Sequence, residues 1–304
     1  RNGLIRLVQN ISCEAVTGGI RVRFYKYHGL GNDFILADNR DNSLEDAGQK
    51  AEKMCNRFFG IGADGLILAE NSSCADIRML IYNSDGSRAE MCGNGLRCFA
   101  KFVYEKLGVK KDPMAVETDA GVLYAGIILK DLTVDAIKVN MGRPVFESGK
   151  IPCTLKEYPV INREINAGGK DYKVTSLLLG VPHTVIFTDD IEDEAVVADG
   201  KAIESCEVFP EKTNVNFVKV INDGEILLRT WERGAGYTYA CGTGACASVV
   251  AGIMNGLLHN KVLAHLRGGD LEISWPERGD VYMVGPALEV YEGDYKLKCF
   301  TRNT

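Results

Sequence analysis

Short runs of hydrophobic and β-branched residues, most of them bounded by Gly, Asn or Asp, recur along the whole chain and predict strands. They cover residues 34–38, 65–70, 77–86, 121–129, 136–142, 184–190, 215–222, 225–234, 271–275 and 282–297. Helical periodicity is confined to residues 44–59, 94–108 and 243–258, and the last two stretches stop near Gly108 and Gly256. Strands in runs with occasional helices predict an α+β fold with mostly antiparallel sheets.

The chain repeats itself at a fixed spacing. Cys92 and Cys241 lie 241 − 92 = 149 residues apart, and each directly precedes a Gly-Xaa-Gly turn and a helical stretch. The same offset places Asn32 opposite Val181 and Asn83 opposite Glu232. Three motifs in the same order at one spacing indicate an internal duplication. We therefore predict two pseudo-symmetric domains, each a curved sheet around a central helix, with the active site in the cleft between them.

The two cysteine turns carry the candidate chemistry. Helix starts offer unpaired backbone N–H groups and a positive dipole end, which bind a carboxylate and are expected to lower the pKa of a nearby thiol. Two facing thiols can remove a proton from one side of a carbon and return one to the other side. The paired turns with Cys92 and Cys241 therefore predict a two-base enzyme that epimerises or racemises an amino acid without a cofactor. The other eight cysteines are expected to be structural.

The composition of the chain argues against several classes of binding partner. The 304 residues are 46% hydrophobic and carry a net charge of −6 without a basic block, which argues against nucleic acid and anionic membranes. No apolar run is long enough for a membrane span. The ten cysteines contain no Cys-Xaa-Xaa-Cys pair and the four histidines are scattered, so no metal site is predicted. Free thiols are expected, in a reducing compartment such as the cytoplasm.

Five motifs resemble the diaminopimelate epimerase family. They are GLGNDFIL, GIGADGLIL, YNSDGSRAEMCGNGLRC, NVNFV and WERGAGYTYACGTGACA, and the likeness runs from about residue 22 to the C-terminus. The resemblance implies interconversion of LL- and meso-diaminopimelate, in lysine and peptidoglycan precursor biosynthesis, with Cys92 and Cys241 as the acid and base. It implies a substrate-binding set of Asn32, Asn83, Gly93, Asn94, Asn216, Glu232, Arg233, Gly242 and Thr243. It also implies a homodimer and a final strand that returns to the first domain.

One position departs from the family pattern. The chain has Gly180-Val181-Pro182-His183 where the family commonly has Gly-Asn-Pro-His, and a valine side chain cannot form hydrogen bonds. Histidine and lysine racemases are similar in motif, so a racemase of another amino acid is the first alternative. A thiol–disulfide oxidoreductase and a non-catalytic amino-acid-binding protein are further ones. Arg233 favours a substrate with a second carboxylate.

The predicted organisation has three parts. Residues 1–20 form an N-terminal extension, residues 21–138 the first domain with a returning strand in 287–304, and residues 139–286 the second domain. The extension lacks an initiator Met and the pattern of a secretory signal. If it is the remnant of a leader, a plastid is the alternative to the cytoplasm.

Overall fold

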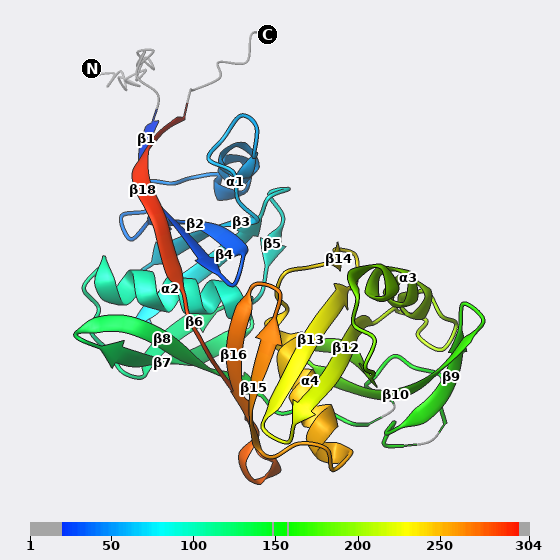
Figure 1. The fold of residues 1–304 in the computed structure, drawn as a ribbon. Coiled ribbons are helices and arrows are strands. Elements are labelled where there is room, and N and C mark those ends of the chain that lie inside the picture. Colours follow the sequence, from blue (N-terminus) through cyan, green and yellow to red (C-terminus); the bar gives the residue numbers. More distant parts are fainter. Residues whose placement is uncertain (1–19, 148, 157, 298–304) are drawn as a thin grey trace, which may run out of the picture.

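The computed structural model describes residues 20–147, 149–156 and 158–297. The proposed extension therefore lies outside the described residues except for residue 20, as do residues 298–304 of the returning strand. Figure 1 shows two lobes that follow one another in the sequence. Within the described residues, no helix has the length and apolar character that a membrane span requires.

The two lobes share a succession of elements, to which the second adds β9 and a 3-10 turn. The first contains β1 (Ile20–Gly29), β2 (Asn32–Asp38), α1 (Ala47–Cys55), β3 (Gly65–Glu70), β4 (Ile77–Asn83), β5 (Arg88–Ala89), α2 (Gly93–Glu105), β6 (Met114–Thr118), β7 (Gly121–Lys130) and β8 (Thr133–Gly142). The second contains β9 (Arg163–Ala167), β10 (Lys170–Leu179), β11 (Val181–Phe187), α3 (Asp193–Glu204), β12 (Asn214–Asn222), β13 (Glu225–Glu232), β14 (Gly236–Tyr237), α4 (Gly242–Met254), β15 (Lys261–Leu266), β16 (Gly269–Ser274), a 3-10 turn (Pro276–Arg278) and β17 (Val281–Gly285). The last strand is β18 (Leu288–Leu297).

The predicted duplication is visible in the strand register. β2 and β3 pair in parallel with Phe34 opposite Gly65, and β11 and β12 pair in parallel with His183 opposite Asn214. Both members of the second pair lie 149 residues after those of the first. The central helices α2 and α4 obey the same offset at both ends. The sheets are otherwise mostly antiparallel, so the predicted α+β fold class is confirmed.

The central helices are buried to different extents, α2 through one broad face and α4 almost all round. In α2 the side chains of Leu96, Phe99 and Phe102 are fully buried against the sheet. In α4 every residue from Gly244 to Gly252 is buried, as its almost uniformly apolar sequence requires. One hydrophobic core runs through both lobes. The two helix starts are thereby fixed on a continuous support.

Besides the chain segment between β8 and β9, two described strand pairings join the lobes. β17 pairs antiparallel with β8 of the first lobe, with Met283 opposite Val139. β18 then returns to pair antiparallel with β1, as predicted for the returning strand. In Figure 1, β18 is the red strand beside blue β1. The exact domain boundaries at 138 and 286 stay a prediction.

The sequence missed one helix and extended another. α3 was not predicted because Gly200 interrupts its pattern, yet a Cβ at this position would lie 2.6 Å from Cβ of Trp231, so only glycine fits. The predicted helix 44–59 is shortened to α1. Asp46 adopts a left-handed conformation before the helix, and Asn56 ends it by accepting hydrogen bonds from the backbone of Phe58 and Phe59.

His265 on β15 is expected to make the stability of the protein depend on pH. Its ring nitrogens lie 2.8 Å from Glu225 Oε1 and 2.7 Å from Asp270 Oδ1, and these carboxylates raise the pKa of His265. A raised folded-state pKa stabilises the protein below the unfolded value of about 6.5, and this contribution disappears as the pH rises through the folded-state pKa.

We therefore expect His265→Gln to lower the melting temperature by about 2 °C in mildly acidic buffer, the shift produced by roughly 1 kcal/mol, and by less in alkaline buffer. Thermal unfolding of both proteins across this pH range measures the difference. His259→Gln is the control, because His259 is exposed and faces a single carboxylate of Asp223. A difference between wild type and His265→Gln that grows with pH would contradict the assignment.

Candidate active site

Cys92 and Cys241 occupy the same place in the two halves. Each is the N-cap residue of its central helix, with extended backbone angles (φ −146°, ψ 119° and φ −115°, ψ 106°). Sγ of Cys92 accepts a hydrogen bond from the backbone N–H of Gly95 at 3.4 Å, and Sγ of Cys241 accepts one from Gly244 at 3.3 Å. The fold therefore builds one thiol-bearing helix start twice.

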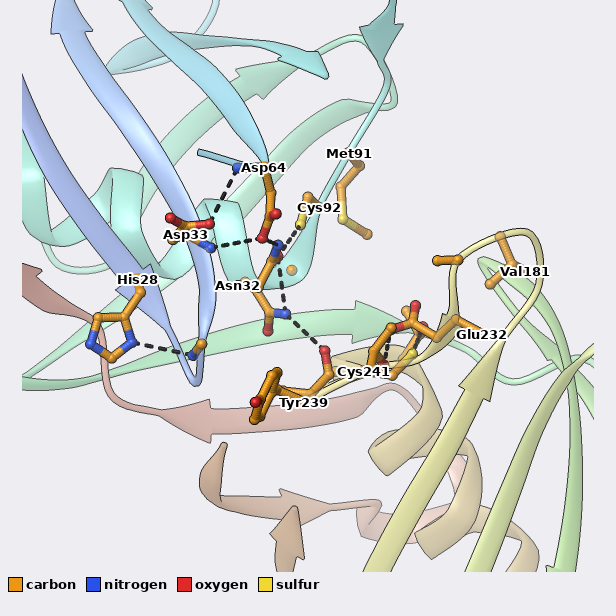
Figure 2. A pocket seen from close by; sticks show the side chains of 18 of the residues that line it. His28, Asn32, Asp33, Asp64, Met91, Cys92, Val181, Glu232, Tyr239 and Cys241 are labelled. Carbon is orange, nitrogen blue, oxygen red and sulfur yellow. Dashed lines mark hydrogen bonds between the residues drawn. The ribbon is translucent and has the colours of Figure 1, made fainter. Parts of the chain in front are cut away.

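Both thiols line one cavity of about 1440 Å³. Its wall comes from the first half through Asn32, Cys92 and Asn94 and from the second through Glu232 and Cys241, among others. Figure 2 shows Cys92 and Cys241 on different sides of this space. The predicted cleft between two halves, with a cysteine from each, is thus present in the structure.

The two helix starts lie close to each other. The Asn94 side chain, on α2, donates a hydrogen bond to the backbone oxygen of Ala240 at 3.4 Å, just before α4. Met283 supports both starts: a Cβ at Gly93 would lie 3.3 Å from its Cε, and one at Gly242 would lie 3.1 Å from its Sδ. Because first-turn N–H groups have no partner within a helix, both ends can direct such donors at one bound anion.

The predicted backbone donors all belong to the cavity wall. Gly93 and Asn94 line it at the start of α2, and Gly242 and Thr243 line it at the start of α4. Two positive dipole ends and several N–H groups are thereby offered to a carboxylate between the thiols. This arrangement also suits the negative charge that builds up on a carboxylate when the neighbouring carbon loses its proton.

Burial dominates the acidity of both thiols. It raises the pKa of Cys92, although hydrogen bonds from Gly95 and Asn94 and the charge of Arg97 lower it. Burial raises the pKa of Cys241 well above its usual range, and the Glu232 carboxylate raises it further. The expectation that the helix ends depress the thiol pKa is therefore wrong in net effect, because the helix contributions are smaller than the cost of burying a thiolate.

Glu232 and Val181 form the wall beside Cys241 (Figure 2). The Thr238 hydroxyl donates a hydrogen bond of 2.6 Å to Oε1 of Glu232. Burial raises the pKa of Glu232, while its hydrogen bonds with Thr238 and Cys241 lower it. Val181 is the first residue of β11, as Asn32 is of β2. The duplication thus places an apolar side chain where the first half has an amide.

Replacing Glu232 by Gln is expected to make Cys241 more acidic. The carboxylate raises the pKa of Cys241, so its removal should move the alkylation of Cys241 to lower pH. The rate of modification by iodoacetamide, followed at each cysteine by peptide mass spectrometry across pH, measures this shift. Glu90→Gln is the control, because Glu90 also lines the cavity but is exposed. An unchanged Cys241 profile in Glu232→Gln would refute the assignment.

Three predicted substrate-binding residues are absent from the described cavity lining. Asn83 is exposed and donates to Ser87 Oγ at 2.9 Å, and Arg233 is exposed with Nη1 donating to the Glu211 backbone oxygen. Asn216 is fully buried, with its amide 3.3 Å from Nδ1 of His183 and its oxygen accepting from Thr230. Their proposed contacts with a substrate stay a prediction.

The sequence did not single out the polar cluster that holds Asn32. Oδ2 of Asp64 accepts a hydrogen bond of 2.8 Å from Nδ2 of Asn32, and Arg57 bridges Asp64 and Asp33 at 2.7 Å each. Burial opposes the ionisation of Asp33, but hydrogen bonds from Arg57 and Lys26 lower its pKa to about 2. Asp64 lies in the GIGADG motif, which was the available signal.

Asn214 is a second residue that the sequence did not single out. It is buried on β12, its amide donates to the Pro182 backbone oxygen at 3.1 Å, and its oxygen accepts from the Arg233 backbone at 2.8 Å. It therefore connects the segment after Val181 to the segment after Glu232.

Among the described residues, no group of three or more His, Cys, Asp or Glu side chains could hold a metal ion.

Comparison with known proteins identifies the family. The sequence model of the diaminopimelate epimerase family matches residues 24–147 and 175–290. The diaminopimelate epimerase of Pelotomaculum thermopropionicum is 48% identical over 279 residues, which cover 91% of this chain and 100% of the relative. That of Caldanaerobacter subterraneus subsp. tengcongensis is 45% identical over 276 residues, with the same coverage of both chains.

Solved structures agree on the fold. A hydroxyproline epimerase from Agrobacterium vitis superposes with a TM-score of 0.65 at 15% identity, covering 92% of this chain and 93% of that one. A methylitaconate-delta-isomerase superposes with a TM-score of 0.66 at 14% identity, covering 92% and 96%. At such identities the likeness concerns the fold alone. The family match and the close relatives show that this chain belongs to the diaminopimelate epimerase family.

Proposed function

We propose that this protein is a diaminopimelate epimerase, an isomerase that interconverts LL- and meso-diaminopimelate without a cofactor. The observation that carries the proposal is the matched pair of N-cap cysteines, one from each half, lining one cavity. Lysine and peptidoglycan precursor biosynthesis is the corresponding pathway. A cytoplasmic location, or a plastid one, and a homodimer belong to the same proposal, and analytical ultracentrifugation tests the dimer.

The reaction needs one thiolate and one thiol. The thiolate of one cysteine takes the proton from the reacting carbon, and the thiol of the other delivers a proton to the opposite face. The electron pair left on the carbon delocalises into the adjacent carboxylate, and the N–H groups at Gly93, Asn94, Gly242 and Thr243 stabilise that charge. Each turnover leaves the two cysteines with exchanged protonation states, so the reverse reaction uses them in exchanged roles.

Polar groups on both sides of the cavity support binding of the amino groups and the distal carboxylate of the substrate. Asn32, fixed by Asp64, offers its side-chain amide on one side, and Glu232 offers a carboxylate on the other. Arg233 follows Glu232 directly, and its guanidinium suits a second carboxylate. Val181 adds an apolar surface, which favours the alternative that the substrate is an amino acid with a different side chain.

Exchange of the α-hydrogen in deuterium oxide tests the proposal. LL-diaminopimelate, L-lysine and L-histidine are incubated separately with the protein, under reducing conditions and without added cofactor. NMR follows deuterium incorporation, and chiral chromatography follows the appearance of the other stereoisomer. We expect deuterium to enter only diaminopimelate, with meso product formed at the same time.

The other outcomes separate the alternatives. Exchange into lysine or histidine in place of diaminopimelate would keep the two-thiol mechanism and make the protein a racemase. Binding without any exchange, equally strong in Cys92→Ala, would indicate an amino-acid-binding protein. Robust turnover of a disulfide substrate would instead support a thiol–disulfide oxidoreductase and overturn the proposal.

A further inference from the structure

The largest fully buried side chain of the described residues is a cation, Arg97. It lies in the second turn of α2, one turn after Cys92, and belongs to none of the ion pairs found among the described residues. Burial of its guanidinium lowers the pKa of Arg97, with no described carboxylate opposing the effect. An unpaired buried charge is costly, and such violations of ordinary packing concentrate at functional sites.

The guanidinium of Arg97 packs closely against the backbone at two glycines. A Cβ at Gly29, at the end of β1, would lie 3.0 Å from Nη2 of Arg97, and one at Gly285, at the end of β17, would lie 3.3 Å from Nε. Nε donates a hydrogen bond of 3.2 Å to the backbone oxygen of Pro286. Nη2 is buried and finds no hydrogen-bond partner among the described residues. The space around the guanidinium therefore requires glycine at positions 29 and 285. Few hydrogen-bond acceptors face the positive charge, so much of it is uncompensated.

A direct contact connects this charge to the active site. Nη1 of Arg97 lies 3.5 Å from Sδ of Met283, the residue that supports both helix starts at Gly93 and Gly242. The ionisable groups that act on Arg97 are the thiols of Cys98, Cys92 and Cys246. Those that act on the Cys92 thiol are Arg97, which favours the thiolate, and Glu232, which opposes it.

We propose that Arg97 is a positioning residue for catalysis: its guanidinium holds Met283 beneath both helix starts and supplies fixed positive charge behind the anions formed there. Those anions are the Cys92 thiolate and the substrate carboxylate that receives the electron pair of the deprotonated carbon. Arg97 does not line the cavity, so it acts through the helix starts and the thiol, without touching the substrate. This inference rests on the proposed epimerase reaction.

The test compares Arg97→Met, which removes the charge, with Arg97→Lys, which keeps it. Lys101→Met is the matched control, because Lys101 is a cation on the same helix whose Nζ donates a hydrogen bond to the Val134 backbone oxygen. We expect Arg97→Met to lower kcat/KM by about 10²-fold and to move alkylation of Cys92 by iodoacetamide to higher pH. Lys101→Met should leave both properties unchanged.

Arg97→Lys provides a second readout if Arg97→Met fails to fold. Arginine stays protonated throughout the accessible pH range, whereas a buried lysine loses its proton more readily. We therefore expect kcat/KM of Arg97→Lys, relative to wild type, to fall by about tenfold or more between roughly pH 7 and pH 10. A constant ratio across this range would overturn the inference, as would a folded Arg97→Met protein with wild-type kcat/KM and an unshifted Cys92 profile.

Wild-type exchange is measured first, so the two proposals fail differently. No exchange into any amino acid by the wild type refutes the epimerase reaction itself. If the wild type exchanges the α-hydrogen but the Arg97 variants do not behave as expected, only the role of Arg97 is refuted.

Discussion

Replacing either Cys92 or Cys241 by Ala is expected to lower the rate of epimerisation by about 10³- to 10⁴-fold. Each thiol is placed on its own helix start and each lines the same cavity, so neither can serve both faces of a bound carbon. The rate is measured as the conversion of LL- to meso-diaminopimelate by chiral chromatography. Both single variants and the double variant should reach a similar low rate, because the two thiols act as a unit.

Cys98→Ala is the matched control for these replacements. Cys98 is a fully buried cysteine on α2, six residues after Cys92, and burial raises its pKa to about 12. Its removal should reduce stability but leave kcat/KM near that of the wild type. Epimerisation by Cys241→Ala at more than about a tenth of the wild-type rate would contradict the two-base mechanism, since general acid–base groups contribute far more than that factor.

The duplicated helix starts could be predicted from the sequence because local signals carry them. Cysteine, Gly-Xaa-Gly and an apolar helical run are contiguous, and their repetition at one offset identifies Cys92 and Cys241 together. The strand runs were also locally encoded by β-branched residues and bounding turns. The longer strands β1, β6, β9, β10 and β15 were not predicted. β1 does carry the signal, because buried Val22 and Phe24 alternate with exposed Arg21 and Arg23.

Features set by burial could not be predicted in the same way. The pKa of each thiol depends on how deeply its helix start is buried in the core. Burial raises this pKa more than the hydrogen bonds from nearby N–H groups lower it. Arg97 reads as a solvated helix residue in the sequence, because arginine is rarely buried. Only the packing of β1, β17 and Pro286 around it reveals otherwise. Asp64 likewise becomes meaningful only when the fold brings it to Asn32.

Gly244→Ala is expected to lower kcat/KM by about 10²-fold, the cost of a small displacement of a catalytic group. A Cβ at Gly244 would lie well inside 3.0 Å of Oδ1 of Asn216 and 3.2 Å from Sγ of Cys241. Asn216 cannot withdraw freely, because it is fully buried and bonded to His183 and Thr230. The helix start must therefore shift, and Cys241 with it. Steady-state kinetics measure the effect, with circular dichroism to confirm folding.

The duplication supplies the matched control for this prediction. Gly95 is the counterpart of Gly244 at the 149-residue offset, and Ile67 is the counterpart of Asn216. A Cβ at Gly95 would lie 3.1 Å from Cδ1 of Ile67. Ile67 is also fully buried, but this contact requires a smaller shift, and an apolar side-chain end is held by no hydrogen bonds. Gly95→Ala should therefore retain most of the activity. Equal losses in the two variants would mean that both helix starts are equally intolerant of a methyl group, and that the buried Asn216 network does not hold Cys241 in place.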